Sequence, residues 1–586
     1  MICDNNKKNF DLFVCVLVVV SSFVGLLGAT NLPGIYLDAV NPDYLSVQML
    51  YPQPDRVSWA IPNWGFPILG QVYHGVFTAY IMAIVIKLVG STSVVLLHAV
   101  NTCYGMIICL GTYRILNKIN INKYIAALVT LSLSCMPALF LSYRTQFYIE
   151  LPGIMFMTFA IDRLVNWSSN RENKNLFLAG LFAGISVYCY YNLVFVFLAY
   201  ILIILVEEKK ELFESKLNCL LTWGSGVALG IILYVVGYTE ILFFDSPNRW
   251  RVMALIIIVY LSWIVIMLMS VKRKKKFLYI MSFLITGIFV YYAFKNFMPI
   301  LLSNFSDGIS KEKISFVKQV CNQINSVSTY LKNMISDASN EYLVFGYEVS
   351  KYNLVYLYTV ISGTFITFII WLYRSIKYKK IDNKALFYSW ISVLTYLLIA
   401  FVFAKSRLQA QHFVPMIIIL SIELAIELDY IYDFVKGKSI KNIVFSLVCV
   451  VLISTCLLNA YNSRKIIKEL DKTGGNNLCT EEINNLAEFA KKNYYAGKKE
   501  LYVFEDWGFM CGFDFLTSNL VAYTTDSSVE YLQAKQKEGY EIIVCCWNVE
   551  TSNEYINKFK DANMKTYFET MNKRNGDVGF YKICLE

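Results

Sequence analysis

Long apolar stretches recur along this sequence, and they constrain its fold more than any other feature. The first, at residues 10–29, has about the twenty residues that a helix needs to cross the hydrocarbon core of a bilayer. Twelve others follow, at residues 92–113, 124–142, 151–166, 176–190, 192–206, 217–243, 252–270, 277–301, 353–373, 385–404, 413–432 and 442–460. Thirteen such stretches predict a mainly α fold, a polytopic bundle of about thirteen transmembrane helices.

The composition excludes the ordinary classes of soluble protein. Of the 586 residues, 56% are hydrophobic and 16% are charged, whereas soluble domains have about 45–50% and about 25%. The net charge of +10 would suggest nucleic acid as the partner of a soluble protein. In a membrane protein, however, Lys and Arg gather in cytoplasmic loops. We therefore expect membrane lipid, and no nucleic acid, as a partner.

The basic residues predict which loops are cytoplasmic. They cluster in alternate connections, at residues 7–8, 114–123, 163–174, 209–216, 272–276, 374–384 and 436–441. The alternation holds only if the apolar stretch 75–89 does not cross, so we interpret it as a re-entrant or interfacial segment within an outer loop, 30–91. The N-terminus is then cytoplasmic. The richness in Lys, Asn and Ile and the lack of an ER retrieval signal favour a bacterial plasma membrane.

Two further regions are predicted to lie outside the cell. The loop 303–352 carries apolar residues from Ile314 to Ile335 at near-helical spacing, which indicates an amphipathic helix at the membrane surface. Residues 461–586 are of mixed polarity, and strand patterns alternate with helical ones. This alternation predicts a small extracytoplasmic α/β domain after a transmembrane domain of residues 1–460.

Carboxylates on the outer face are the main candidates for chemistry, because the chain has only three His residues. Asp38 and Asp43 follow the first span, where a carboxylate can meet both a lipid headgroup and a hydroxyl. A partly desolvated carboxylate in that position can serve as a general base. Position alone allows equally that these are ordinary acidic residues of an outer loop.

Two more outer connections carry charged candidates. Arg144 could hold a phosphate, and Glu150 could share a metal or orient an acceptor, although both could also cap helices as a snorkelling pair. Lys405, Arg407 and His412 lie between two late spans, where cations could bind a lipid phosphate. The cysteines show no metal-ligand spacing, so a divalent cation held by carboxylates is the one metal we consider.

The order of these short motifs resembles the GT-C superfamily of integral membrane glycosyltransferases, in particular the protein O-mannosyltransferase and aminoarabinose-transferase-like group. Members have an acidic motif followed by an aromatic residue after the first span, matched here by Asp43 and Tyr44. The segment 64–90, which includes His74, is similar to the juxtamembrane stretch of the family. Arg144 with Glu150 resembles the second-loop motif, and the segment 407–415 resembles the late Arg-containing motif.

The resemblance implies a transferase that uses a lipid-linked sugar donor, a polyprenyl-phosphate monosaccharide, on the outer face. Asp43 would deprotonate an acceptor hydroxyl of a glycan, lipid or protein, and the sugar would be transferred with inversion while Arg144 or Arg407 stabilises the leaving phosphate. Tyr44, His74, Lys405 and His412 would contact substrate. The usual Asp-Glu pair is absent, which leaves Asp38 as an alternative base.

Two other functions fit the same compartment. A transporter or flippase of lipid-linked saccharides would use the outer α/β domain for recognition, and a cell-surface polysaccharide polymerase would share the lipid substrate. Transport predicts polar residues along many spans and an inverted internal repeat, and neither is evident in the sequence.

Overall fold

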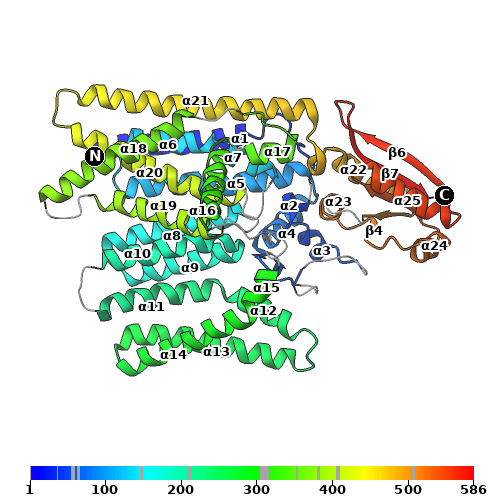
Figure 1. The fold of residues 1–586 in the computed structure, drawn as a ribbon, viewed down its shortest axis with the longest axis horizontal. Coiled ribbons are helices and arrows are strands. Elements are labelled where there is room, and N and C mark those ends of the chain that lie inside the picture. The colour runs from blue at the N-terminus through cyan, green and yellow to red at the C-terminus, as the bar shows by residue number, and fades with distance from the viewer. Residues whose placement is uncertain are drawn as a thin grey trace.

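The computed structural model describes residues 2–585 except 36, 54–59, 62–65, 146–149, 209–212, 304–315, 337, 351–353, 379–382, 404–409 and 505–507. Helices dominate the chain up to residue 473, and a small sheet with its own helices follows (Figure 1). The first part consists of α1 (Ile2–Val24), α2 (Leu37–Val40), α3 (Leu45–Leu50), β1 (Leu69–Gln71), β2 (His74–Gly75), α4 (Phe77–Val89), α5 (Val94–Lys118), α6 (Lys123–Ser134), α7 (Pro137–Thr145), α8 (Glu150–Asn170), α9 (Asn173–Cys189), the 3-10 helix η1 (Tyr191–Val196), α10 (Phe197–Glu207), α11 (Phe213–Gly230) and α12 (Ile232–Phe243).

The second part of the bundle adds further helices, and one of them, α16, crosses the others (Figure 1). The helix α16 lies across the ends of several others in Figure 1, and it contacts η4, α7, α17, α19 and α20. The elements are α13 (Arg249–Arg273), α14 (Lys276–Tyr292), the π-helical η2 (Ala293–Phe297), α15 (Met298–Ser303), α16 (Phe316–Ser336), α17 (Ala338–Phe345), α18 (Leu354–Tyr378), α19 (Lys384–Phe403), η4 (Ala410–Phe413), α20 (Val414–Val435) and α21 (Lys441–Thr473).

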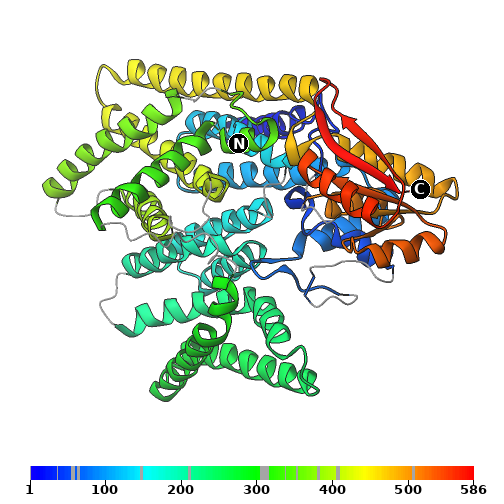
Figure 2. The ribbon, with the colours of Figure 1, turned by 45° about the vertical axis from the view of Figure 1, so that its right-hand side comes forward.

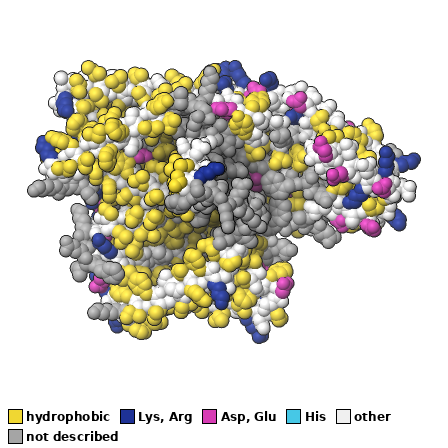
Figure 3. Space-filling model, viewed as in Figure 1, with side chains coloured by type: hydrophobic (Ala, Val, Ile, Leu, Met, Phe, Trp, Pro, Cys, Tyr) yellow, Lys and Arg dark blue, Asp and Glu magenta, His cyan; other side chains and the backbone are white. Residues whose placement is uncertain are grey.

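The chain is a multi-pass membrane protein. Among the described residues, six helices are long and apolar enough to cross a bilayer, or up to eight if each of two bent pairs is one span. The surface of the bundle is largely hydrophobic, whereas charged side chains of both signs cover the α/β domain (Figure 3). The predicted fold class, a mainly α bundle with a C-terminal α/β domain, is confirmed; the count of thirteen spans stays a prediction.

Two stretches that we interpreted as single spans are broken. The stretch 124–142 forms α6 and α7 at 43° to each other, and 217–243 forms α11 and α12 at 52°. Pro137 opens α7, because proline lacks the N–H that a helix interior needs and is tolerated in a first turn. The segment 75–89 contains α4, whose 13 residues span about 20 Å, too short to cross a core of about 30 Å.

The C-terminal region is a sheet with helices on both faces. Strand order is β4-β3-β5-β7-β6, with β3 parallel to β4 and β5, and β7 antiparallel to β5 and β6. The predicted strands are present, and one helix, α23, was not predicted. The elements are η5 (Asn477–Cys479), α22 (Glu482–Tyr495), β3 (Glu500–Val503), α23 (Met510–Thr517), β4 (Ala522–Thr524), α24 (Val529–Lys537), β5 (Glu541–Cys546), α25 (Val549–Asp561), β6 (Thr566–Asn572) and β7 (Val578–Leu585).

Alternation along the strands sends side chains to two different cores. Leu501 and Val503 pack with the buried residues of α24 and α25. Tyr502 points the other way, because successive residues of a strand face opposite sides, and it joins α22, α23 and the loop after α1 in one cluster. The elements α2, α3 and α4 accordingly lie between the bundle and the domain (Figure 1).

The boundary between the two regions differs from the one expected at residue 461. The helix α21 continues without a break to Thr473, so the predicted boundary falls inside it. The chain then turns at Gly474 and Gly475, whose φ angles are +72° and +89°. Only glycine adopts such angles readily, and a Cβ on Gly475 would lie 2.2 Å from the carbonyl oxygen of Cys479.

We expect Gly34→Ala to loosen the domain from the bundle, because its Cβ would lie 1.8 Å from the carbonyl oxygen of Thr480. Overpacking of this kind costs about 1–3 kcal/mol of unfolding free energy. Thermal unfolding of the purified protein, followed by tryptophan fluorescence, measures the loss. Gly287→Ala is the control, since nothing lies within 4 Å of its added Cβ. Equal melting temperatures for the two variants would contradict the close contact.

Candidate active site in the loop after the first helix

The loop after α1 buries the two acidic residues that it carries. Asp38 lies on α2 and Asp43 in the turn before α3, and their exposed fractions are 8% and 1%. The turn is held by its own backbone: the N–H of Tyr44 donates to the oxygen of Val40 at 2.8 Å, and Ser46 Oγ donates to the oxygen of Asp43 at 2.5 Å. Both acids are thus fixed on one short segment, largely removed from water.

The C-terminal domain holds this loop from one side. The N–H of Gly34 donates to the carbonyl oxygen of Cys479 at 2.8 Å, and the N–H of Ile35 donates to Asn484 Oδ1 at 3.2 Å. Farther along, Gln48 Nε2 donates to Asp514 Oδ2 at 2.8 Å. These bonds begin on both sides of the two aspartates, so the position of the domain sets the position of the acids.

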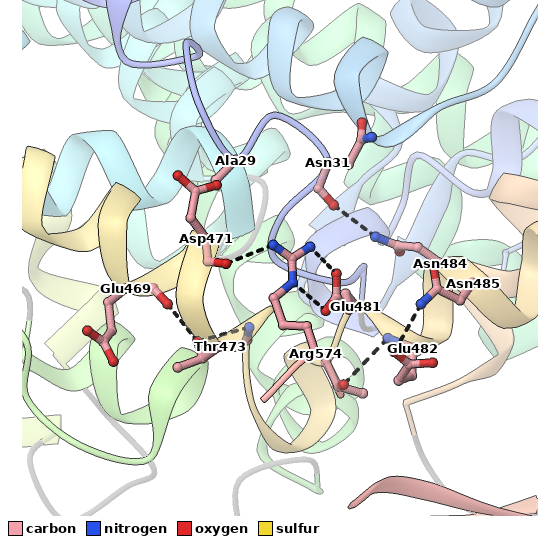
Figure 4. A network of polar contacts seen from close by, with 12 residues as sticks. Ala29, Asn31, Glu469, Asp471, Thr473, Glu481, Glu482, Asn484, Asn485 and Arg574 are labelled. Carbon is pink, nitrogen blue, oxygen red and sulfur yellow. Dashed lines mark hydrogen bonds and ion pairs between the residues drawn. The ribbon is translucent and has the colours of Figure 1, made fainter. Parts of the chain in front are cut away.

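A polar network fastens the domain to α21 (Figure 4). Arg574, from the turn between β6 and β7, donates through Nε and Nη2 to both carboxylate oxygens of Glu481, and through Nη1 to the carbonyl oxygen of Asp471 at 2.8 Å. Asn484 Nδ2 in the same view donates to the carbonyl oxygen of Asn31 at 3.0 Å. Figure 2 shows the β6–β7 hairpin beside the end of α21. The network therefore joins the last helix of the bundle, the domain and the loop.

Arg144 holds the loop from the side of the bundle. Its guanidinium is 1% exposed, and it donates to four carbonyl oxygens, those of Gly25, Gly28, Ala29 and Leu32. The sequence allowed Arg144 either to hold a substrate phosphate or to cap a helix; in the structure its Nη atoms donate to the main chain that follows α1. These bonds give Arg144 a positioning role.

His98 of α5 supports the same segment. Its Nδ1 donates to the carbonyl oxygen of Thr30 at 3.0 Å, and the ring is fully buried. The first turns of α5 and the end of α7 thus fix the chain between α1 and α2 through polar contacts to its carbonyl groups.

His74 is buried beside the turn that carries Asp43. Its Nδ1 donates to the carbonyl oxygen of Gly75 at 3.2 Å, which leaves Nε2 to accept from Asn41 Nδ2 at 3.3 Å. Burial lowers the pKa of His74 to about 4. The imidazole is therefore neutral at neutral pH, with its tautomer set by these two partners.

A row of aromatic rings connects this loop to the segment before α20. Ring centroids lie 5.0 Å apart for His74 and Tyr73, 6.2 Å for Tyr73 and Tyr191, 5.6 Å for Tyr191 and Tyr190, and 6.3 Å for Tyr190 and His412. We call these five residues the aromatic row. Its two ends are His74 and His412, two residues that sequence analysis singled out 338 positions apart.

The acids lie close to tyrosines of the bundle. Burial, and then the negative charge of Asp38, raise the pKa of Tyr73. Tyr104 of α5 is buried, and its hydroxyl has no hydrogen-bond partner among the described residues. The loop that carries the two acids and the aromatic row therefore contain carboxylates, a neutral imidazole and phenol groups on adjoining segments.

Several predicted residues are not placed. Lys405 and Arg407 lie outside the described residues, and α8 begins at Glu150 without a description of its side chain. Across the part of the chain that is described, no three His, Cys, Asp or Glu side chains form a group that could hold a metal ion.

Sequence analysis missed the tyrosines of the aromatic row. Tyr190 is the last residue of one stretch that we interpreted as a span, 176–190, and Tyr191 lies between it and the next, where aromatic residues are common. The structure places them at the junction of α9 and η1, where the helix ends and adjacent side chains can point toward the outer loop. The break at Tyr191 between the two apolar stretches was the available signal.

Residues 73–238 match the model of a protein family described as dolichyl-phosphate-mannose-protein mannosyltransferase. Among solved structures, the chain is similar to the archaeal oligosaccharyltransferase AglB of Archaeoglobus fulgidus in complex with an inhibitory peptide and a dolichol-phosphate, with 12% identity, a TM-score of 0.49 and coverage of 98% of this chain and 74% of that one. For the S. cerevisiae protein O-mannosyltransferase Pmt1-Pmt2 complex bound to the sugar donor, identity is 14%, the TM-score 0.31 and coverage 41% and 34%. No curated protein matches this chain by sequence.

We expect Arg144→Lys to destabilise the protein although it keeps the charge. Lysine has three donors, so at least one of the four carbonyl groups would lose its partner, at a cost of about 1–3 kcal/mol. The free energy of unfolding in a denaturant series measures this loss, and Arg251→Lys, at an exposed position, is the control. An unchanged stability would contradict the positioning role.

We expect His74 to make stability depend on pH. Its folded-state pKa of about 4 lies below the ordinary value of 6.5, so the unfolded chain binds the proton first. Stability is full above about pH 6.5 and falls as the pH drops toward 4, by roughly 3 kcal/mol in total. The unfolding free energies of the unmodified protein and of His74→Gln are compared between pH 7 and 4.5. Other acids titrate in both proteins, so the difference between the two curves reports on His74. Parallel curves for the two proteins would refute it.

Proposed function

We propose that this chain, whose residues 73–238 match a mannosyltransferase family model, is a membrane glycosyltransferase of the GT-C superfamily. In this proposal it transfers a sugar from a polyprenyl-phosphate donor to an acceptor hydroxyl on the outer face of the membrane. The observation that supports the proposal is that the loop after α1 contains the buried Asp38, Asp43 and His74, and that the aromatic row leads from His74 to His412. A general base next to aromatic rings suits sugar transfer to a hydroxyl, since the base takes the proton and the rings pack against the sugar.

Asp43 is the base in this proposal. The residue is 1% exposed, in a turn that the bonds of Tyr44 and Ser46 hold in place, and a general base must be held within reach of the proton that it takes. The acceptor hydroxyl gives its proton to Asp43, its oxygen forms a bond with the anomeric carbon, and the bond from that carbon to the phosphate oxygen breaks with inversion. The lipid phosphate leaves with the electron pair and needs no proton.

The remaining residues of the site orient the substrates. Asp38 lies on α2 in the same loop as Asp43, so we assign it a place beside the base. Neutral His74 is held by Asn41 and the Gly75 carbonyl, so we assign it a place in the wall of the sugar site. Tyr44 is fully buried in the cluster shared with the domain, so we assign it to supporting the turn that carries Asp43.

The donor phosphate requires a cation. The Nη atoms of Arg144 are engaged by carbonyl oxygens, so we assign the phosphate to Arg407 and Lys405, which precede His412 by five and seven residues. Arg is suited to this task because its planar fork can donate two hydrogen bonds to one phosphate. A divalent cation shared by Asp38, Asp43 and Glu150 is a further proposal, and activity in EDTA tests it.

We expect Asp43→Asn to lower the rate of sugar transfer by at least about 100-fold, since positioned general bases contribute about 10²–10⁴. Purified protein is incubated with a polyprenyl-phosphate monosaccharide and an acceptor, and the released polyprenyl phosphate is measured. Asp561→Asn, at the end of α25, is the matched control, and both variants should unfold at the same temperature as the unmodified protein.

Two outcomes test two separate proposals: that Asp43 is the base, and that the protein is a glycosyltransferase. Transfer by Asp43→Asn at more than a few per cent of the normal rate would remove Asp43 from the role of base. No release of polyprenyl phosphate by the unmodified protein, together with movement of saccharide headgroups across a liposome bilayer, would identify a transporter instead.

A further inference from the structure

A second site lies at the opposite end of the bundle from Asp38 and Asp43. The length of α5 gives the distance between the two sites. His98, near the start of this helix, contacts the loop after α1, and Lys118, its last residue, lines the second site. Twenty residues of helix separate the two, about 30 Å at 1.5 Å per residue. At the Lys118 end, a cavity of about 350 Å³ opens between α5, α8, α10, α19 and α20.

The walls of this cavity are apolar. They include Ile115, Leu164, Ile203, Ile422 and Ile426, one or more from each of four helices. The volume falls within the range of about 300–1,000 Å³ that is typical of small-molecule sites. A narrow apolar space between membrane helices suits an alkyl chain, because the walls offer few hydrogen bonds to a polar ligand.

The mouth of the cavity has an excess of positive charge. Lys118 Nζ lies 2.5 Å from Asp162 Oδ1, and Arg114 Nε lies 3.2 Å from the same oxygen. Two cations thus share one carboxylate.

The same arrangement recurs on the other side of the mouth. Glu207 binds both Arg171 and Lys384, the latter at 2.9 Å, and it also accepts from the Tyr388 hydroxyl. Each cluster therefore has two cations against one carboxylate and keeps one positive charge in excess. Both lysines line the cavity itself.

We propose that this cavity binds an anionic phospholipid of the cytoplasmic leaflet, with one acyl chain between the helices and its phosphate at Lys118 and Lys384. The charge excess is complementary to a phosphate, and the apolar walls are complementary to an acyl chain. The basic loops at this end are those that the charge distribution predicts to be cytoplasmic, where anionic lipids gather. The site is independent of the proposed sugar transfer, which takes place at the other end.

The test uses the full chain in nanodiscs that contain phosphatidylglycerol with a photoreactive group on its acyl chain. Irradiation should label peptides of α8, α19 and α20, and photoreactive phosphatidylcholine at the same fraction should give about ten times less label. The double variant Lys118→Ala/Lys384→Ala should lower phosphatidylglycerol labelling to the phosphatidylcholine level. In this variant Asp162 still pairs with Arg114 and Glu207 with Arg171, so the protein should fold. Lys123→Ala, at an exposed position on the same side, is the control.

Additional variants and competing ligands in the same labelling experiment identify what the cavity binds. Ser392→Trp fills the cavity and should abolish labelling by both lipids; the lysine variant, which leaves the walls intact, decides the outcome if the tryptophan variant does not fold. Equal labelling by the two lipids, or labelling that survives Ser392→Trp in a folded protein, would overturn the proposal. Displacement by millimolar glycerol phosphate would assign the site to a soluble phosphate, and preferential displacement by polyprenyl phosphate would assign it to the sugar-carrying lipid; both outcomes also overturn it.

Discussion

The hydrogen bonds of Arg144 to the main chain are the interaction on which the candidate site depends. The chain between α1 and α2 is irregular, so its carbonyl groups have no helix or strand partners, and a buried carbonyl without a partner costs free energy. One guanidinium satisfies the oxygens of Gly25, Gly28, Ala29 and Leu32. This allows an irregular segment to lie inside the protein, next to the two acids.

The second constraint is the core that the loop shares with the C-terminal domain. Ile35, Tyr44 and Leu45 pack in the same cluster as Phe513 and Phe580, so the loop has no hydrophobic core of its own. The opposite face of the sheet is covered by the helices of the domain itself. The domain is therefore one wall of the site, and a change in its docking would move the acids directly.

Local patterns in the sequence predicted the elements, while tertiary contacts decided the site. Strands β3 to β7 follow from alternating and apolar runs, and the apolar stripe of α22 from residues at helical spacing. Hydropathy could not reveal that 217–243 bends by 52°, because both halves are apolar. Nor could it distinguish an Arg144 that binds phosphate from one that binds carbonyl groups, since the residue type and its position after a span are the same in both cases. That distinction depends on whether the carbonyl groups of the chain after α1 lie next to Arg144 in the folded protein.

The hydrogen bonds of Arg144 to the main chain affect which cations can bind the phosphate of the donor. Carbonyl oxygens occupy both Nη atoms of Arg144, so a departing phosphate would take its hydrogen bonds from another cation. His74 is neutral at physiological pH and cannot supply that charge. The pair Lys405 and Arg407 belongs to the segment that leads into η4, and η4 places His412 on the aromatic row. The proposed division of labour therefore assigns proton transfer to the first loop and phosphate binding to the segment before α20, with the tyrosines between them beside the sugar.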